Sequence, residues 1–312
     1  MSPERHAPTT VLSVITTGAE LGARLDSARA DGLSVGLVPT MGALHRGHGE
    51  LIRRAADQCD LTVVSVFVNP LQFGVGEDFE AYPRDLEADA DLAVRAGADL
   101  VFAPSAEEMY PRPIKTTVHV DELTTVLEGA YRPGHFDGVS TVVAKLFALT
   151  GRCRAYFGEK DWQQLAVVRR MASDLSMPVE VIGCPTVREP DGLALSSRNV
   201  YLTPAEREVA PFIHLALQAG SQMVADGETD PVAISSVMVG VLVTEPAFDL
   251  HYAVAVDPSS LRSPPAFDLG DDVRLLVAAR LGRARLLDNA GVTVGLPLSP
   301  SDRKADTTCA GA

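Results

Sequence analysis

The sequence is poor in cysteine and in long apolar runs. Its four cysteines stand far apart, at positions 59, 153, 184 and 309, so neither a zinc site nor a disulfide framework is indicated. No stretch approaches the ~20 apolar residues that a membrane span needs, and the run at 11–15 is too short for the core of a signal peptide. We therefore expect a protein of the reducing cytoplasm, with no membrane partner.

Positive charge is scarce as well. Lysine and arginine number 27 against 41 aspartates and glutamates, which leaves a formal charge of −14. Because nucleic acids and anionic membranes are bound by basic surfaces, neither is expected as a partner. With 46% apolar residues the chain has the composition of an ordinary globular protein, and its 312 residues predict about two domains of ~150 residues each.

Short apolar runs alternate with helical patterns through the first three-fifths of the chain. The runs have the near-continuous apolar character of strands buried on both faces of a parallel sheet, and they fall at 34–39, 61–68, 98–102, 154–157 and 179–182. Helices are expected between them, at 46–58, 84–96, 139–150 and 162–175. This alternation predicts an α/β fold with a Rossmann-like doubly wound parallel sheet over residues 1–187.

The turn at 189–192 opens a region with a different pattern. Thr203, Pro204 and Glu206 fit the N-cap, the first position and the N3 position of a helix that would run to about 225. A second helix is expected at 231–243, followed by strands around 252–256 and 273–278. We predict a smaller α+β domain over 188–290 that closes over the site, and a disordered tail over 291–312.

Two histidines, His45 and His48, follow the first of these predicted strands where a helix begins. In an open α/β sheet, ligands bind beyond the carboxyl ends of the strands, where free helix N–H groups can receive phosphate. Imidazoles three residues apart would face one way and could donate hydrogen bonds to phosphate. A chance HxGH string is the plain alternative. The absence of HExxH disfavours zinc, and the absence of GxGxxG disfavours a nicotinamide enzyme.

Three further polar clusters stand at strand ends or in the turn between the domains. Asp161 could cap a predicted helix, and Lys160 beside it could contact phosphate. The Ser-Ser-Arg loop at 196–198 could clamp an oxyanion. Asn69 and Gln72 could hydrogen-bond a hydroxylated or carboxylated substrate without adding charge. Taken singly, a solvated helix cap, a polar loop and an ordinary turn explain these clusters at least as well.

The four clusters in this order closely resemble the pantothenate synthetase, or pantoate:beta-alanine ligase, family over 35–289. The resemblance is carried by the blocks VPTMGALHRGH, FVNPLQF, YPRDLEAD, RPGHFDGVSTVVAKL, FGEKDWQQL and TVREPDGLALSSRN. It implies an ATP-dependent ligase that condenses (R)-pantoate with beta-alanine to pantothenate, AMP and pyrophosphate through an enzyme-bound pantoyl adenylate. It also implies Mg²⁺ bound with the ATP, and a homodimer.

The resemblance further implies roles for individual residues. His48 would be the proton donor, and His45, Lys160 and Arg198 would complete the catalytic set. The ATP site would comprise Met41, Gly42, Ala43, Leu44, His45, Arg46, Gly47, His48, Gly158, Glu159, Lys160, Asp161, Val187, Leu195, Ser196, Ser197 and Arg198. The pantoate contacts would be Asn69, Gln72, Arg132 and Gln164. Gln72 would also lie near beta-alanine.

Three positions depart from the family pattern. Arg46 stands where an acidic residue is usual and is expected to add positive charge beside the triphosphate. Gly49 replaces a larger residue, which weakens the helix start by up to about 1 kcal/mol relative to Ala. Leu195 replaces Met, a change that conserves volume. No metal ligand is assigned. Asp89 is a candidate to lie near the magnesium, and a solvated helix face is its alternative.

Two other classes of protein stay open from the residues. A nucleotidylyltransferase or aminoacyl-tRNA synthetase shares HxGH and a later Lys- or Ser-rich loop, but a synthetase would need a basic RNA-binding region. A nucleotide-binding regulator without turnover is the second class. The joint presence of His45, His48, Lys160 and Arg198 argues against it.

Overall fold

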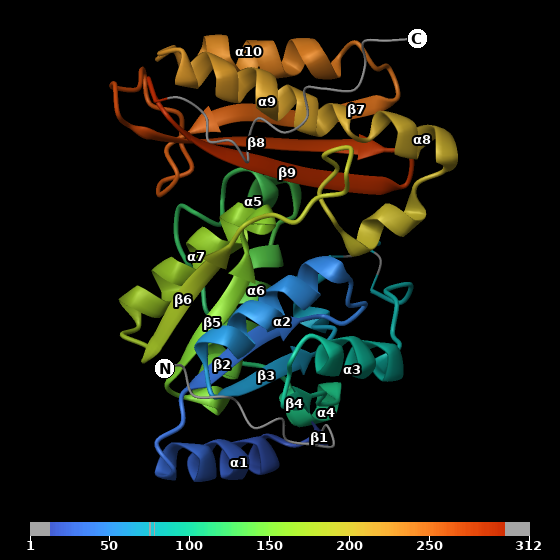
Figure 1. Ribbon diagram of the computed structural model, residues 1–312, viewed down its shortest axis with the longest axis vertical. Coiled ribbons are helices and arrows are strands. Elements are labelled where there is room, and N and C mark those ends of the chain that lie inside the picture. The colour runs from blue at the N-terminus through green and yellow to red at the C-terminus, as the bar shows by residue number, and fades with distance from the viewer. Residues whose placement is uncertain (1–12, 75, 78, 297–312) are drawn as a thin grey trace, which may run out of the picture.

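The computed structural model describes residues 13–74, 76–77 and 79–296, which form two units, each with its own sheet (Figure 1). Over these residues the larger sheet has six strands, all parallel. In sheet order they are β1 (Ser13–Ile15), β4 (Leu100–Phe102), β3 (Leu61–Val66), β2 (Val35–Thr40), β5 (Cys153–Gly158) and β6 (Val179–Cys184). The chain runs outward from β2 through β3 and β4, then returns to the other side of β2. This confirms the doubly wound sheet, whose ligand crevice lies at the reversal between β2 and β5.

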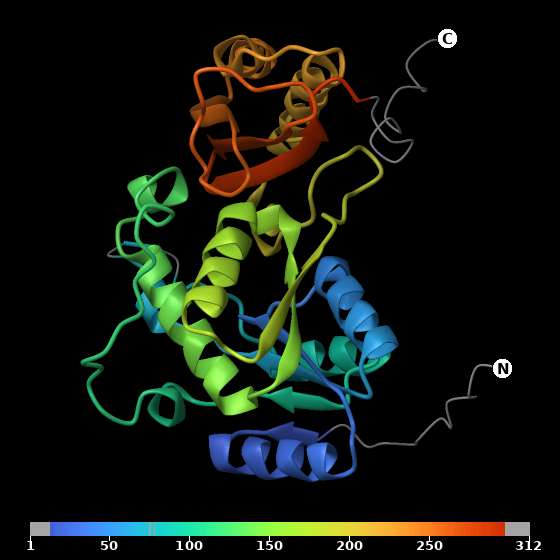
Figure 2. The same ribbon diagram turned by 90° about the vertical axis from the view of Figure 1, so that its left-hand side faces the viewer.

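Helices cover both faces of the larger sheet (Figure 2). The helices on one face are α1 (Gly18–Ala30), α6 (His135–Thr150) and α7 (Trp162–Asp174), and those on the other are α2 (Arg46–Gln58) and α3 (Leu86–Arg95). Successive strand residues point to opposite faces, so Leu37 packs in the first core and Val38 in the second. Both faces are therefore apolar. This is why the strands appear in the sequence as unbroken apolar runs.

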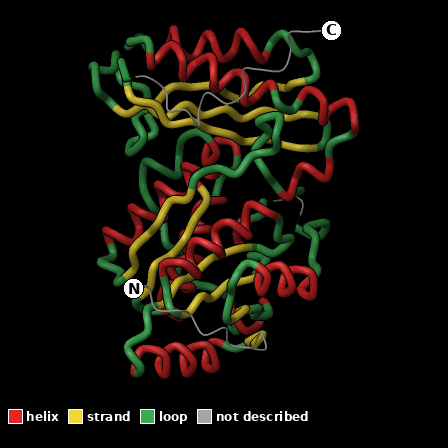
Figure 3. The backbone as a smooth tube through the Cα atoms, viewed as in Figure 1, coloured by secondary structure: helices red, strands yellow, loops and turns green. Residues whose placement is uncertain are grey.

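The smaller unit is an antiparallel sheet covered by helices on its outer face (Figures 1 and 3). Its elements are α8 (Pro204–Val209), α9 (Phe212–Ala225), α10 (Pro231–Leu242), β7 (Phe248–Val256), β8 (Asp272–Leu281) and β9 (Ala284–Thr293). The inner face meets the larger unit, because Val256 and Leu276 belong to the core around α6 and α7. Within the described ranges, no helix is long and apolar enough to cross a membrane.

Short helices complete the fold. They are η1 (Pro70–Gln72), α4 (Ala106–Met109), α5 (Glu128–Tyr131), η2 (Glu159–Asp161) and η3 (Ser197–Tyr201). Most of them follow strands or join the two units, so they lie near the carboxyl edge of the larger sheet. Three of them, η1, η2 and η3, carry residues that the sequence analysis singles out. A fourth, α5, ends at Tyr131, directly before the predicted site residue Arg132.

The strands and main helices predicted for the larger unit are confirmed, although the helix predicted at 139–150 begins at His135. The helix predicted over 203–225 is instead two helices, α8 and α9, which separate at Pro211 because proline has no N–H to donate. The tail predicted from 291 is wrong at its start, because β9 continues to Thr293, which pairs with Asp272. Residues 297–312 lie outside the described part. The sequence analysis missed β1, α1 and β9.

Candidate active site

One carboxylate fixes the loop that follows β2. Gly42 and Ala43 have φ angles of 85° and 50°, in the left-handed region that disfavours a residue with a Cβ. Asp89 of α3 accepts hydrogen bonds from the backbone N–H groups of Ala43 at 3.1 Å and Leu44 at 2.6 Å. The side chain is buried, and burial raises the pKa of its carboxyl group. A solvated helix face is therefore wrong for Asp89, since both of its oxygens anchor the loop.

His45 and His48 fix each other's orientation at the start of α2. Nδ1 of His45, the N-cap residue, accepts from the N–H of Gly47 at 3.1 Å, and Nδ1 of His48 accepts from the N–H of His45 at 3.3 Å. Because Nδ1 accepts in both rings, each neutral imidazole carries its proton on Nε2. Burial, assisted by Lys160, lowers the pKa of His45 to about 4. Burial, assisted by His45, lowers the pKa of His48 to about 3. Both rings are neutral N–H donors at pH 7.

Strand β5 lies beside β2, so its carboxyl end brings Lys160 and Asp161 to the same crevice. Nζ of Lys160 lies 3.4 Å from Oδ1 of Asp161. Burial would raise the pKa of Asp161, but the positive charges of Lys160 and Arg198 outweigh it and lower the pKa. Asp161 is the N-cap residue of α7, as predicted, but its side chain makes no capping hydrogen bond to the helix. The carboxylate is charged and interacts with the two cations instead.

Strand β3, on the other side of β2, leads into a pair of amides. The Asn69 amide donates to Oε1 of Gln72 at 3.0 Å and to the backbone oxygen of Gly138 at 3.1 Å. The Gln72 amide in turn lies 2.9 Å from the sulfur of Met41. Gly138 permits this arrangement, because a Cβ there would overlap the backbone oxygen of Leu71. Asn69 and Gln72 thus form a rigid, uncharged wall.

Two residues of β9, Asp288 and Asn289, hold the cavity segments from the side of the smaller unit. The Asn289 amide donates to the backbone oxygen of Lys160 at 2.7 Å and to that of the preceding residue at 2.9 Å. Asp288 accepts from Nη2 of Arg188 at 3.0 Å. Arg188 also donates to the backbone in the turn that leads to 196–198. The smaller unit therefore fixes both the Lys160 segment and the loop at 196–198.

These segments line one cavity of about 210 Å³. The predicted site residues in its lining are Met41, His45, Gly47, His48, Asn69, Gln72, Gly158, Lys160, Asp161, Gln164, Val187, Leu195, Ser196, Ser197 and Arg198. Cations, hydroxyls and neutral N–H donors are thus gathered in a single concave space with uncharged amides. Such a space can bind an anion and hold a second, polar molecule against it.

Other predicted residues lie outside this lining. They are Gly42, Ala43, Leu44, Arg46, Arg132 and Glu159. The guanidinium of Arg46, expected beside the triphosphate, instead donates to the backbone oxygen of Arg188 at 3.0 Å and to the carboxylate of Glu189 at 3.3 Å. Its charge is therefore paired at the junction of the two units rather than presented to the cavity.

Arg132, predicted to contact pantoate, lies behind the amide wall. Its Nε donates to Glu77 at 2.8 Å, and its Nη2 donates to the backbone oxygen of Gln72 at 3.3 Å. Nδ1 of His135 donates to the same oxygen at 2.9 Å, because its Nε2 must accept from the guanidinium at 3.0 Å. Burial, assisted by Arg132, lowers the pKa of His135 to about 4. Arg132 thus contacts the wall through Gln72.

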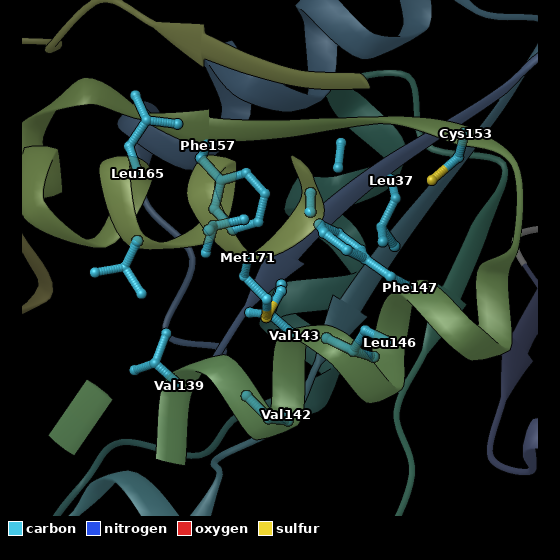
Figure 4. Packing of buried hydrophobic residues seen from close by; sticks show 14 of the residues in the cluster. Leu37, Val139, Val142, Val143, Leu146, Phe147, Cys153, Phe157, Leu165 and Met171 are labelled. Atoms are coloured by element: carbon cyan, nitrogen blue, oxygen red, sulfur yellow. The ribbon is translucent and has the colours of Figure 1, made fainter. Parts of the chain in front are cut away.

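The sequence analysis missed the apolar floor of the cavity. Val139, Val142 and Val143 line it, and Figure 4 shows them on α6, in the same cluster as Phe157 of β5. Their helical spacing is visible in the sequence, but spacing does not separate a position that faces the core from one that faces a cavity. Tyr82, which also lines the cavity, lies in one of the quoted family blocks.

The comparisons with known proteins agree on one family. The family model described as pantoate-beta-alanine ligase matches residues 13–291. A pantothenate synthetase from Sinorhizobium medicae is 51% identical over 278 residues, which cover 89% of this chain and 95% of the relative. A crystal structure of pantothenate synthetase from Thermus thermophilus superposes with a TM-score of 0.84 at 50% identity, covering 92% of this chain and 100% of that one.

A second solved structure bears on ligands. It is a pantoate-beta-alanine ligase from Francisella tularensis, described as complexed with beta-gamma ATP and beta-alanine. It superposes with a TM-score of 0.74 at 31% identity, and it covers 90% of this chain and 97% of its own.

Proposed function

The chain belongs to the pantoate-beta-alanine ligase family, and we propose that the cavity described above carries out the reaction of that family. The reaction joins pantoate to beta-alanine through a new C–N bond at the expense of ATP. It yields pantothenate, AMP and pyrophosphate through a pantoyl adenylate. The observation that carries the proposal is a single cavity in which cations and neutral N–H donors meet uncharged amides over an apolar floor.

Forming an adenylate explains why the cavity needs no nucleophilic side chain. The carboxylate oxygen of pantoate attacks the α-phosphorus of ATP, and pyrophosphate leaves with the electron pair of the broken P–O bond. The amine of beta-alanine then attacks the activated carbonyl carbon, loses a proton and expels AMP. The protein must align these groups and stabilise the negative charge that develops on phosphorus-bound oxygens.

We assign the phosphates of ATP to the side lined by His45, His48 and Lys160. The two imidazoles present Nε2–H groups, so they donate hydrogen bonds to phosphate without gaining or losing a proton. The resemblance implies a proton donor at His48. A pKa of about 3 makes this residue a neutral hydrogen-bond donor instead. Lys160 and Arg198 supply the positive charge, and the serines at 196 and 197 add hydroxyl donors. The carboxylate of Asp161 accepts hydrogen bonds from the ribose hydroxyls.

We assign pantoate to the amide wall. Asn69, Gln72 and Gln164 offer donors and acceptors to its carboxylate and hydroxyls. The two methyl groups of pantoate then lie against Val139 and Val143, where apolar burial favours them. Beta-alanine approaches on the side of Gln72. Because the wall carries no charge, it holds pantoate through directed hydrogen bonds rather than through ion pairs.

Magnesium would be held mainly by phosphate oxygens and water. Over the described residues, no group of three His, Cys, Asp or Glu side chains is arranged to hold a metal ion. Both oxygens of Asp89 are used by the backbone of Ala43 and Leu44. Mg²⁺ usually keeps several waters in nucleotide sites, so this donor set suits it. Asp161 is the one carboxylate among the described lining residues, and it is assigned to the ribose, which leaves the ion to phosphate and water.

The test incubates the full chain with ATP, Mg²⁺ and pantoate, with and without beta-alanine. We expect pyrophosphate that depends on pantoate in both mixtures, and pantothenate with AMP when beta-alanine is present. ADP as a product, or pyrophosphate that forms without pantoate, would exclude the proposal. His48→Ala should abolish most turnover. The matched control is His119→Ala, because His119 is an exposed histidine outside the cavity.

Three finer features rest on the family resemblance. We propose a homodimer, a cytoplasmic location, and closure of residues 188–290 over the bound substrates. The thiols at 59, 153 and 184 are unpaired and buried, which suits a reducing compartment. A monomer mass in light scattering would contradict the homodimer. Recovery of the protein in a membrane or secreted fraction would contradict the cytoplasmic location. A radius of gyration unchanged by ATP and pantoate would contradict the closure.

A further inference from the structure

A second cavity, of about 380 Å³, lies beside the first and is strongly basic. Over the described residues its lining carries two carboxylates, those of Glu77 and Glu128, and five guanidinium groups, those of Arg132, Arg198, Arg280, Arg283 and Arg285. Five positive and two negative charges leave +3, in a chain whose total charge is −14. His251, also in the lining, is held neutral because burial lowers its pKa. Such an excess of positive charge indicates an anion site.

Both carboxylates of this cavity are already paired. Glu77 accepts from Arg132 at 2.8 Å, and Glu128 accepts from Arg285 at 2.7 Å. Arg280 and Arg283 are exposed, and within the described ranges neither has an ion-pair partner. Among the described residues, the positive charge that no carboxylate balances therefore lies on Arg280 and Arg283.

Arg198 lines both cavities, so the two cavities are neighbours. The packing around the β8–β9 turn supports this arrangement. Arg283 follows Gly282 in the turn between β8 and β9. The turn packs so closely on α8 that a Cβ at Gly282 would overlap the carboxylate of Glu206. That carboxylate belongs to the capping box of α8, and α8 directly follows η3, which carries Arg198. Arg283 in the turn and Arg280 near the end of β8 thus share a lining with Arg198, the residue common to the two cavities.

We propose that the second cavity is a diphosphate site that receives the pyrophosphate expelled from the first. The inference rests on the proposed function, in which pyrophosphate is expelled from the α-phosphorus and Arg198 supplies positive charge to the phosphates of ATP. Pyrophosphate carries several charged oxygens in a small volume, and guanidinium groups bind such oxygens two at a time. Arg280 and Arg283 continue the positive charge of Arg198 toward solvent, so they offer the product a way out that does not cross the adenylate.

The test uses the full chain with the double variant Arg280→Gln/Arg283→Gln. Inorganic pyrophosphate is titrated by calorimetry without ATP, and its inhibition of pantothenate formation is measured separately. We expect the dissociation and inhibition constants to rise about tenfold or more, as for lost charge-assisted hydrogen bonds. The difference should shrink at high salt, because exposed charges are screened. Arg24→Gln/Arg112→Gln, which removes two exposed arginines outside both cavities, is the matched control and should change neither constant.

A non-hydrolysable ATP analogue separates the two sources of a diphosphate group. Unchanged affinity for the analogue, together with weakened pyrophosphate binding, supports the product site. Equal weakening of both ligands would overturn it and assign the cavity to bound ATP. Unchanged pyrophosphate affinity in the double variant would also overturn it. Because pyrophosphate binding is measured without turnover, a chain that makes no pantothenate but shows the expected loss would contradict only the proposed function.

Discussion

Replacing Asn289 by leucine tests how the smaller unit controls the cavity. The Asn289 side chain is 3% exposed; its amide donates to the backbone oxygens of residues 159 and 160, and its Oδ1 accepts from Arg274 at 2.9 Å. Leucine has a similar size but no polar atoms, so two part-buried backbone oxygens and one guanidinium N–H lose their partner. Each such loss costs about 0.5–3 kcal/mol. We expect Asn289→Leu to lower the free energy of unfolding by about 2–5 kcal/mol, measured by urea denaturation.

The same variant should damage ATP use more than its stability loss explains. The backbone of Lys160 would no longer be fixed, and a displacement near 1 Å at a reacting group can reduce kcat/KM about 100-fold. Thr293→Val on the same strand removes only an exposed hydrogen bond to Asp272 and should stay within about twofold. Steady-state kinetics well below the unfolding temperature measure both variants. If Asn289→Leu loses stability but keeps kcat/KM for ATP, Asn289 is purely structural and the reasoning fails.

Other changes test single parts of the cavity. His48→Gln keeps an N–H donor and should retain far more turnover than His48→Ala, which should lose about 10²–10³ in kcat; equal losses would contradict a neutral donor. Gly138→Ala overlaps the backbone oxygen of Leu71, so it should cost about 1–3 kcal/mol of stability and raise KM for pantoate more than KM for ATP. The third prediction concerns acid. His48 has a pKa of about 3 in the folded chain and about 6.5 unfolded, so the folded state binds fewer protons. Its contribution to stability is complete above pH 6.5 and is lost as the pH falls toward 3. Wild type should therefore lose more stability than His48→Gln between pH 7 and pH 5 in urea denaturation, and an equal loss would refute this.

The sequence by itself determined most elements of both units and the groups at their ends, although it missed β1, α1 and β9. The start of α8 is an example, since the side chains of Thr203 and Glu206 each accept from the backbone N–H of the other. At the start of α2, the His48 side chain likewise accepts from the backbone N–H of His45. Each interaction joins residues three apart, and each strand is a contiguous apolar run. Such features depend on neighbours within one turn or one strand, so they can be predicted from the order of residues.

Only the tertiary structure decided which distant groups meet. The order of strands puts β5 beside β2, which makes one cavity of two separate motifs. Arg132 pairs with Glu77 behind the amide wall, Asp89 anchors the loop at 43–44, and Asn289 holds the Lys160 segment. These contacts join residues 55, 46 and 129 positions apart. No local period encodes such pairs, because each forms only when the apolar cores bring two sheets and their helices together and exclude the water that would otherwise satisfy those groups.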